Sequence, residues 1–142
     1  MKKYHIGYTQ GTFDMFHVGH LNIVNKAKDL CDILIVGVNS DELVHSYKDK
    51  TPIINENDRQ LIVSNIKAVD KCMIVNTLDK EEIWNEIHFN AIFIGDDWKN
   101  NERWKNTENI LEKYNAEVIY LPHTDGISST ILRPMESNKI ED

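Results

Sequence analysis

The chain has 142 residues, a length typical of one domain, and a formal net charge of −7 at pH 7. This negative charge argues against a general nucleic-acid binder, which normally presents a basic surface to the phosphates. The N-terminus lacks a long apolar segment, and no apolar run approaches membrane-spanning length. We therefore expect one soluble, cytoplasmic domain over residues 1–142, with no nucleic-acid or membrane partner.

Strand-like and helix-like patterns alternate along the chain. The hydrophobic pattern predicts strands at 5–8, 33–38, 72–75, 91–94 and 118–121, and helices at 18–30, 41–46, 56–66, 80–87 and 108–114. This alternation favours an α/β fold, a Rossmann-like doubly wound sheet of five parallel strands. In such a sheet, ligands bind beyond the carboxyl ends of the strands, where the strand order reverses.

The two cysteines lie in apolar segments of the sequence. Cys31 and Cys72 are far apart and show no C-x-x-C spacing. This arrangement favours buried, reduced thiols over a disulfide or a metal site.

The first chemically informative segment is Gly11-Thr12-Phe13-Asp14-Met15-Phe16-His17-Val18-Gly19-His20, between the first strand and the first helix. Gly19 lets the backbone approach an anion, and the helix directs its free N–H groups and positive dipole end at the same place. His17 and His20 can stabilise charge that grows on a triphosphate, as displacement at the α-phosphorus of a nucleotide requires. Taken alone, the four residues His17-Val18-Gly19-His20 would also fit a turn with two solvated histidines or part of a zinc site.

A second loop follows the last predicted strand. Gly126 frees the backbone there, and Ser128, Ser129 and Thr130 offer hydroxyls and amides at a helix start. These groups suit the β- and γ-phosphates of a nucleotide, although a serine at a helix start is also an ordinary N-cap.

Together the two motifs resemble the nucleotidyltransferase superfamily over about residues 4–132. The closest likeness is to the small bacterial glycerol-3-phosphate cytidylyltransferases, followed by the choline- and ethanolamine-phosphate cytidylyltransferases. The resemblance implies that His17, His20 and Lys48 are catalytic. It implies a nucleotide site of Gly11, Thr12, Phe13, His17, Gly19, His20, Asp97, Thr124, Gly126, Ile127, Ser128, Ser129, Thr130 and Arg133. It implies an acceptor site of Lys48, Lys50, Arg59, Lys67 and Trp98.

The chain departs from the family pattern at positions that hold phosphate. His123 stands where the family has an arginine, and Lys67 replaces another arginine, which keeps the charge but loses the bidentate fork. Asp125 and Ser129 replace a glutamate and a threonine. Arg133 completes a spelling similar to the Ile-Ser-Ser-Thr-x-x-Arg motif of related adenylyltransferases and could supply the missing guanidinium, although Pro134 disfavours helical geometry there.

The segment Gly95-Asp96-Asp97-Trp98 ends the fourth predicted strand and resembles the family's Gly-Asp-Asp-Trp, which favours CTP over ATP. Asp97 could accept a hydrogen bond from the cytosine amino group, although carboxylates in such a turn are commonly solvated. Trp84, Trp98 and Trp104 leave open an aromatic cage for a quaternary ammonium, as choline phosphate would need.

The expected function is transfer of a cytidylyl group from CTP to a small phosphomonoester, glycerol 3-phosphate, for a cell-envelope precursor. We expect Mg²⁺ to arrive with the nucleotide, because the sequence shows no carboxylate cage for a metal of its own. The resemblance also implies a homodimer. The alternatives are a choline- or ethanolamine-phosphate acceptor, an adenylyltransferase that uses ATP, and a catalytically silent nucleotide-binding regulator.

Overall fold

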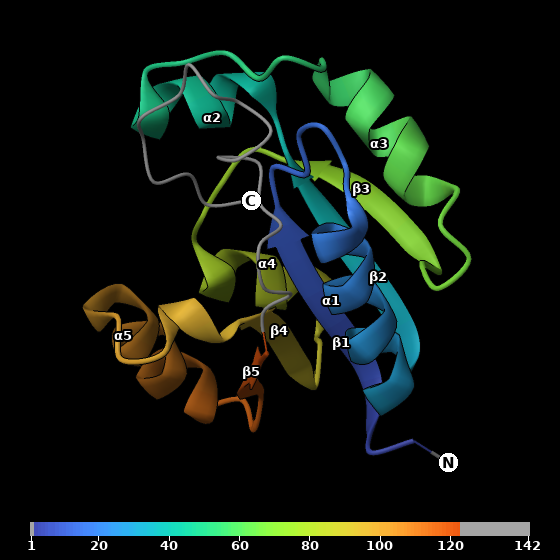
Figure 1. The fold of residues 1–142 in the computed structure, drawn as a ribbon. Helices are drawn as coiled ribbons and strands as arrows, with labels where there is room; N and C mark the ends of the chain where they lie inside the picture. The colour runs from blue at the N-terminus through green and yellow to red at the C-terminus, as the bar shows by residue number, and fades with distance from the viewer. Residues whose placement is uncertain (1, 123–142) are drawn as a thin grey trace.

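The computed structural model describes residues 2–122, in which strands and helices alternate (Figure 1). The elements are β1 (Tyr4–Gly11), α1 (Val18–Leu30), β2 (Cys31–Asn39), α2 (Asp41–Lys48), α3 (Glu56–Ser64), β3 (Lys71–Val75), α4 (Lys80–Ile87), β4 (Ala91–Gly95), the 3-10 helix η1 (Asp96–Trp98), α5 (Glu102–Glu112) and β5 (Glu117–Leu121).

The five strands form one parallel sheet in the order β3-β2-β1-β4-β5. The chain first winds outward from β1 to β3 and then crosses back to β4 on the other side of β1. The strand order therefore reverses between β1 and β4, and the α/β doubly wound fold is confirmed. Ligands of such sheets bind at the carboxyl ends of the strands on either side of this reversal.

Side chains alternate between the two faces of the sheet, as the geometry of a strand requires. On one face Val36, Val38 and Phe93 belong to a core with α1 and α3. On the other face Tyr8 and Ile92 belong to a core with α4 and α5. Figure 1 shows the resulting three layers, with α2 near the carboxyl ends of the strands.

Gly37 in β2 has no room for a side chain. A Cβ atom at this position would lie 2.1 Å from the Tyr8 hydroxyl oxygen. That hydroxyl donates a 2.7 Å hydrogen bond to Gln10 Oε1, so the glycine lets a buried tyrosine reach a polar partner at the end of its own strand.

Several predicted boundaries are wrong. The first strand continues to Gly11, because Tyr8–Gly11 pair in register with β2. α2 continues to Lys48, where Asp49 ends it in the left-handed conformation, and α3 ends at Ser64 instead of residue 66. α5 begins at Glu102 and ends at Glu112, not 108–114, and the 3-10 turn η1 is not predicted.

Cys31 is buried, Cys72 is half-buried, and both thiols are free. Within residues 2–122, no helix has the length and apolar character needed to span a bilayer.

Candidate active site

The turn between β1 and α1 is tightly constrained. Thr12, Phe13 and Asp14 are buried, and Phe13 (φ 54°) and Met15 (φ 51°) adopt the left-handed backbone conformation. Such conformations are strained for residues with side chains and persist only when the surroundings impose them. The turn therefore enters α1 with a fixed geometry.

His17 and His20 are held at the start of α1 by reciprocal hydrogen bonds. His17 is the N-cap, and its Nδ1 accepts from the Gly19 N–H at 3.0 Å. His20 Nδ1 accepts from the His17 N–H at 3.2 Å, and the two rings stack with centroids 3.9 Å apart. Because each Nδ1 accepts, the proton of each neutral ring is on Nε2. The pair thus has two fixed N–H donors of the kind that stabilises phosphate oxygens.

His20 is the more buried of the two histidines, with 6% of its surface exposed. Its ring lies against Phe13 and Phe16. Burial, followed by the electrostatic effect of the neighbouring His17, lowers the pKa of the His20 imidazole to about 3. His20 is therefore neutral at physiological pH, so it can donate a hydrogen bond from Nε2 but carries no full positive charge.

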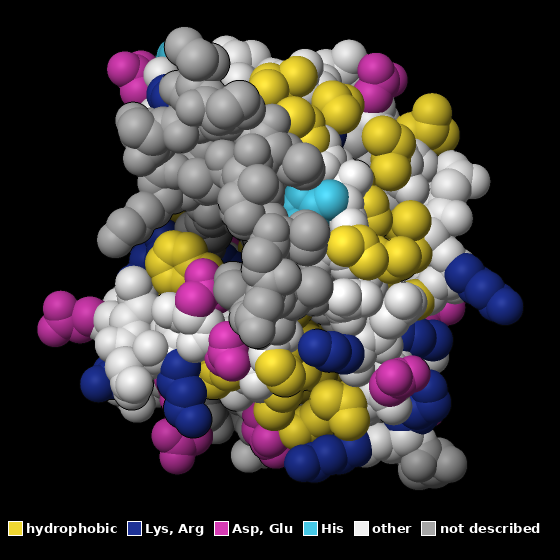
Figure 2. All heavy atoms as spheres, viewed as in Figure 1, with side chains coloured by type: hydrophobic (Ala, Val, Ile, Leu, Met, Phe, Trp, Pro, Cys, Tyr) yellow, Lys and Arg dark blue, Asp and Glu magenta, His cyan; other side chains and the backbone are white. Residues whose placement is uncertain are grey.

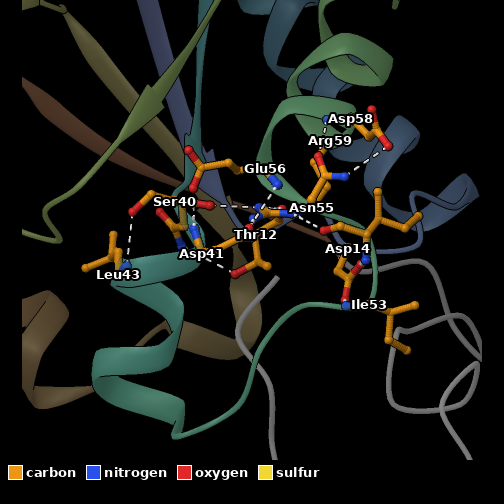
Figure 3. A network of polar contacts seen from close by, with 12 residues as sticks. Thr12, Asp14, Ser40, Asp41, Leu43, Ile53, Asn55, Glu56, Asp58 and Arg59 are labelled. Carbon is orange, nitrogen blue, oxygen red and sulfur yellow. Dashed lines mark hydrogen bonds and ion pairs between the residues drawn. The ribbon is translucent and has the colours of Figure 1, made fainter.

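Arg59, expected to contact the acceptor, lies fully buried beneath the turn. Its guanidinium donates to the carbonyl oxygens of Thr12 and Asn39, and it pairs with Asp41 (Figure 3). A side chain in this position supports the site from below and does not face solvent.

The three lysines assigned to the acceptor lie in different places. Lys48 ends α2, with its ammonium 5.5 Å from the centroid of the Tyr47 ring, and Lys50 follows two residues later; both are half-buried. Lys67 is exposed in the connection from α3 to β3. That connection leads into the amino end of β3, so the structure does not bring Lys67 to the histidine turn.

Asp97 and Trp98 lie in η1, directly after the carboxyl end of β4. Asp97 is exposed and Trp98 is half-buried. Their strand neighbours β1, which carries the histidine turn, so the structure places both residues at the point where the strand order reverses.

Each of the three tryptophans has a ring contact with a different side chain. Trp98 has the Arg103 guanidinium 5.6 Å from its ring centroid, and Trp104 has the Lys80 ammonium at 5.1 Å. Trp84 stacks on Tyr114 with centroids 4.0 Å apart. The tryptophan positions give no support to a choline phosphate acceptor.

The remaining assigned residues lie outside the described part of the chain. They are His123, Thr124, Asp125, Gly126, Ile127, Ser128, Ser129, Thr130 and Arg133. Gly11 is the last residue of β1, Thr12 and Phe13 lie in the turn that follows it, and Gly19 lies in the first turn of α1.

Sequence reasoning missed the polar residues that support the site. Asn39 donates to Tyr47, and its Oδ1 accepts from Gln10 at 2.8 Å. The Asp14 carboxylate accepts two backbone N–H groups. Of these residues, only Asp14 could have been noticed in the sequence, because it is an acidic residue within an otherwise apolar stretch of the turn between β1 and α1.

Comparison with known proteins extends these observations. The family model described as cytidylyltransferase-like matches residues 8–135. A glycerol-3-phosphate cytidylyltransferase of Bacillus spizizenii is 36% identical over 126 residues, covering 88% of this chain and 92% of that protein. An FAD synthase of Korarchaeum cryptofilum is 35% identical over 127 residues, covering 87% and 86%. The solved structure of the lipopolysaccharide core biosynthesis protein from Thermoplasma volcanium GSS1 has a TM-score of 0.71 at 26% identity, covering 85% and 97%.

The doubly wound parallel sheet agrees with these matches, which show that the chain is an enzyme of the nucleotidyltransferase class. Because the family model matches nearly the whole chain, the protein belongs to the cytidylyltransferase-like family. The resemblance to glycerol-3-phosphate cytidylyltransferases, expected from the motifs, is confirmed.

Proposed function

We propose that this enzyme transfers the cytidylyl group of CTP to glycerol 3-phosphate, giving CDP-glycerol and pyrophosphate. The observation that carries the transfer chemistry is the stacked pair of His17 and His20, each with its Nδ1 bound to backbone N–H. The choice of CTP and glycerol 3-phosphate is supported by the 36% identity to a glycerol-3-phosphate cytidylyltransferase.

In the proposed step, a phosphate oxygen of the acceptor attacks the α-phosphorus of CTP. A new O–P bond forms, the bond from the α-phosphorus to the bridging oxygen breaks, and the electron pair leaves with pyrophosphate. The Nε2–H groups of His17 and His20 donate to the oxygens on which charge grows. Lys48 and Lys50 hold the acceptor phosphate, and Asp97 accepts from the cytosine amino group.

We place Mg²⁺ on the nucleotide. No group of three or more His, Cys, Asp or Glu side chains within residues 2–122 is arranged to hold a metal. Asp14, the carboxylate of the phosphate turn, uses both oxygens to accept backbone N–H groups. Mg²⁺ prefers oxygen ligands and keeps several waters, so triphosphate oxygens and water provide suitable ligands, and the ion would neutralise charge on the leaving pyrophosphate.

The test is a matrix of nucleotides and acceptors with pyrophosphate release as the readout. CTP and ATP are each combined with glycerol 3-phosphate, ethanolamine phosphate and choline phosphate, and with flavin, heptose and pantetheine phosphates. We expect turnover with CTP and glycerol 3-phosphate, lost on chelation with EDTA and restored by Mg²⁺. CTP binding without pyrophosphate release from any pair would instead identify a silent regulator.

Adenylyl transfer from ATP is the second candidate. It is favoured by the 35% identity to an FAD synthase, nearly equal to the identity with the cytidylyltransferase. Turnover with ATP and none with CTP in the same matrix would establish this candidate and contradict the first.

We further propose that the enzyme is a homodimer. Val18, Ile53, Leu61 and Ile62 are large exposed hydrophobic side chains, and we call them the apolar patch. Figure 2 shows hydrophobic side chains gathered on the face of α3 and the start of α1, beside a histidine. Exposed apolar groups that gather in this way are typical of interaction surfaces.

A further inference from the structure

The segment between α2 and α3 is tied to the histidine turn at both of its ends. At the α2 end, the Tyr47 hydroxyl lies 3.4 Å from Thr12 Oγ1 and accepts from Asn39 Nδ2 at 3.2 Å. At the α3 end, the Asp14 carboxylate accepts from the N–H groups of Ile53 and Ile54 at 2.7 and 2.9 Å. The residues between these two anchors, 48–52, include both Lys48 and Lys50.

Asp14 is specialised for this contact. Its side chain is completely buried, where an ionised carboxylate is stable only when its oxygens accept hydrogen bonds. Oδ2 accepts from Ile53 and Oδ1 from Ile54, so one side chain of the turn fixes two consecutive peptide groups of the segment (Figure 3).

Arg59 makes a second connection between the same parts of the chain. Its Nε donates to the Ile54 carbonyl oxygen at 2.8 Å, and its Nη1 donates to the Thr12 carbonyl oxygen at 2.8 Å. The ion pair with Asp41 offsets the charge of the buried guanidinium (Figure 3). Ile54 is thus held through both its N–H and its carbonyl group.

We propose that Asp14 and Arg59 are positioning residues that fix the segment 48–52, and with it Lys48 and Lys50, relative to His17 and His20. In the proposed function the two lysines bind the acceptor and the two histidines bind the nucleotide. A misplacement of about 1 Å between such groups can lower the rate about a hundredfold. This inference rests on the proposed function, because it takes Lys48 and Lys50 as the groups that hold the acceptor phosphate.

The first experiment is a double-mutant cycle between Asp14→Asn and Lys50→Ala. The asparagine keeps the size of Asp14 but turns an NH₂ donor toward one of the two backbone N–H groups. We expect Asp14→Asn to lower kcat/KM for the acceptor about tenfold or more, with a smaller change in KM for the nucleotide. In the Lys50→Ala background the same substitution should cost clearly less than in the wild-type background, because one of the two lysines that it positions is gone. An equal loss in both backgrounds would overturn the proposal.

The matched control is Asn90→Ala. Asn90 Oδ1 also accepts a backbone N–H, that of Ile6 at 2.8 Å, but near the amino end of β1. We expect it to lower the melting temperature while acceptor kcat/KM stays near the wild-type value, and to combine additively with Lys50→Ala. Tyr47→Phe, which removes only one hydroxyl from the other anchor, is a milder variant should Asp14→Asn fold poorly. Tyr47→Phe should show the same kind of coupling to Lys50→Ala. Additive effects of the two substitutions would again contradict the proposal that these contacts fix the segment 48–52.

A readout without turnover separates this proposal from the proposed function. Trypsin cleaves after Lys50, and cleavage requires the segment to leave its anchored position. In the enzyme without substrates, Asp14→Asn and Arg59→Lys should be cut there faster than wild type and Asn90→Ala. Equal cutting rates in all four proteins would refute the proposal that Asp14 and Arg59 fix this segment, even if pyrophosphate is released. Absence of pyrophosphate release from every pair would refute the proposed function and leave the cleavage result intact.

Discussion

We assign His17 two separable tasks, one to each ring nitrogen. Nδ1 caps α1 by accepting the Gly19 N–H, and Nε2 carries the proton that we assign to the phosphates. The two tasks can be tested apart, because asparagine is among the best N-cap residues but reaches no further than the Nδ1 position.

His17→Asn should therefore keep the fold and lose the chemistry. We expect a melting temperature near wild type and a kcat lower by roughly two orders of magnitude, measured as pyrophosphate release. His17→Gln, whose amide NH₂ reaches toward the Nε2 position, should retain more activity than His17→Asn despite the poorer cap. Turnover near wild type in His17→Asn would contradict the role of Nε2.

The burial of His20 makes stability depend on pH. The pKa of His20 is about 3 in the folded protein and near its ordinary value of about 6.5 when unfolded. Between these values the unfolded chain binds more protons, so the free energy of unfolding falls as pH drops from about 6.5 toward 3, by up to about 1.4 kcal/mol per pH unit. Urea unfolding of His20→Gln should show a shallower loss over this window than wild type. Parallel curves would show that His20 is not the responsible group.

At the level of single residues, sequence reasoning selected two histidines that the structure brings together, and it missed the contacts that support them. The spacing His17-x-x-His20 at a helix start is a local pattern, so it can be recognised in the sequence without knowledge of the tertiary structure. The role of Arg59 depends on carbonyl groups of Thr12 and Asn39, which are distant in sequence, and nothing local distinguishes a buried arginine from one that contacts a phosphate.

Among the secondary-structure elements, types were predicted better than ends. The five strands and five α-helices of residues 2–122 were all expected, because their hydrophobic periodicity is local. The start of α5 was missed because Asn101, which caps it by accepting from Arg103 and Trp104 N–H, precedes six largely polar residues with little periodicity. β1 extends to Gly11 because pairing with β2, a tertiary contact, carries the strand past its apolar run.

The packing of β2 against Tyr8 gives a prediction for Gly37→Ala. The added methyl group would displace the Tyr8 hydroxyl, so we expect a loss of about 1–3 kcal/mol in the free energy of unfolding, measured by urea denaturation. In a Tyr8→Phe background part of this loss should disappear, because the closest clash is gone. An equal loss in both backgrounds would show that the hydroxyl is not the obstacle.

For the whole molecule, the apolar patch predicts a change in assembly. Leu61 is 61% exposed, so Leu61→Glu should be nearly neutral for a monomer and should separate a dimer that buries the patch. We expect the variant to sediment as a monomer at concentrations where wild type is dimeric. Ile33→Thr, which changes an exposed apolar residue on β2, should leave the mass unchanged. A monomeric wild type would rule out the patch as a self-association surface.

Because the strands are parallel, their amino ends lie together at one end of the sheet and their carboxyl ends at the other. The amino end carries tertiary contacts such as that of Asp70 with the Leu34 N–H, and the carboxyl end carries the histidine turn and η1. We expect substitutions at the first end to change mainly stability, and substitutions at the second end, where ligands of such sheets bind, to change substrate choice. Overall sequence identity counts the residues at both ends of the sheet equally. A lineage of such enzymes can therefore diversify its substrates while its members stay about equally similar, as the near-equal identities to a cytidylyltransferase and an FAD synthase illustrate.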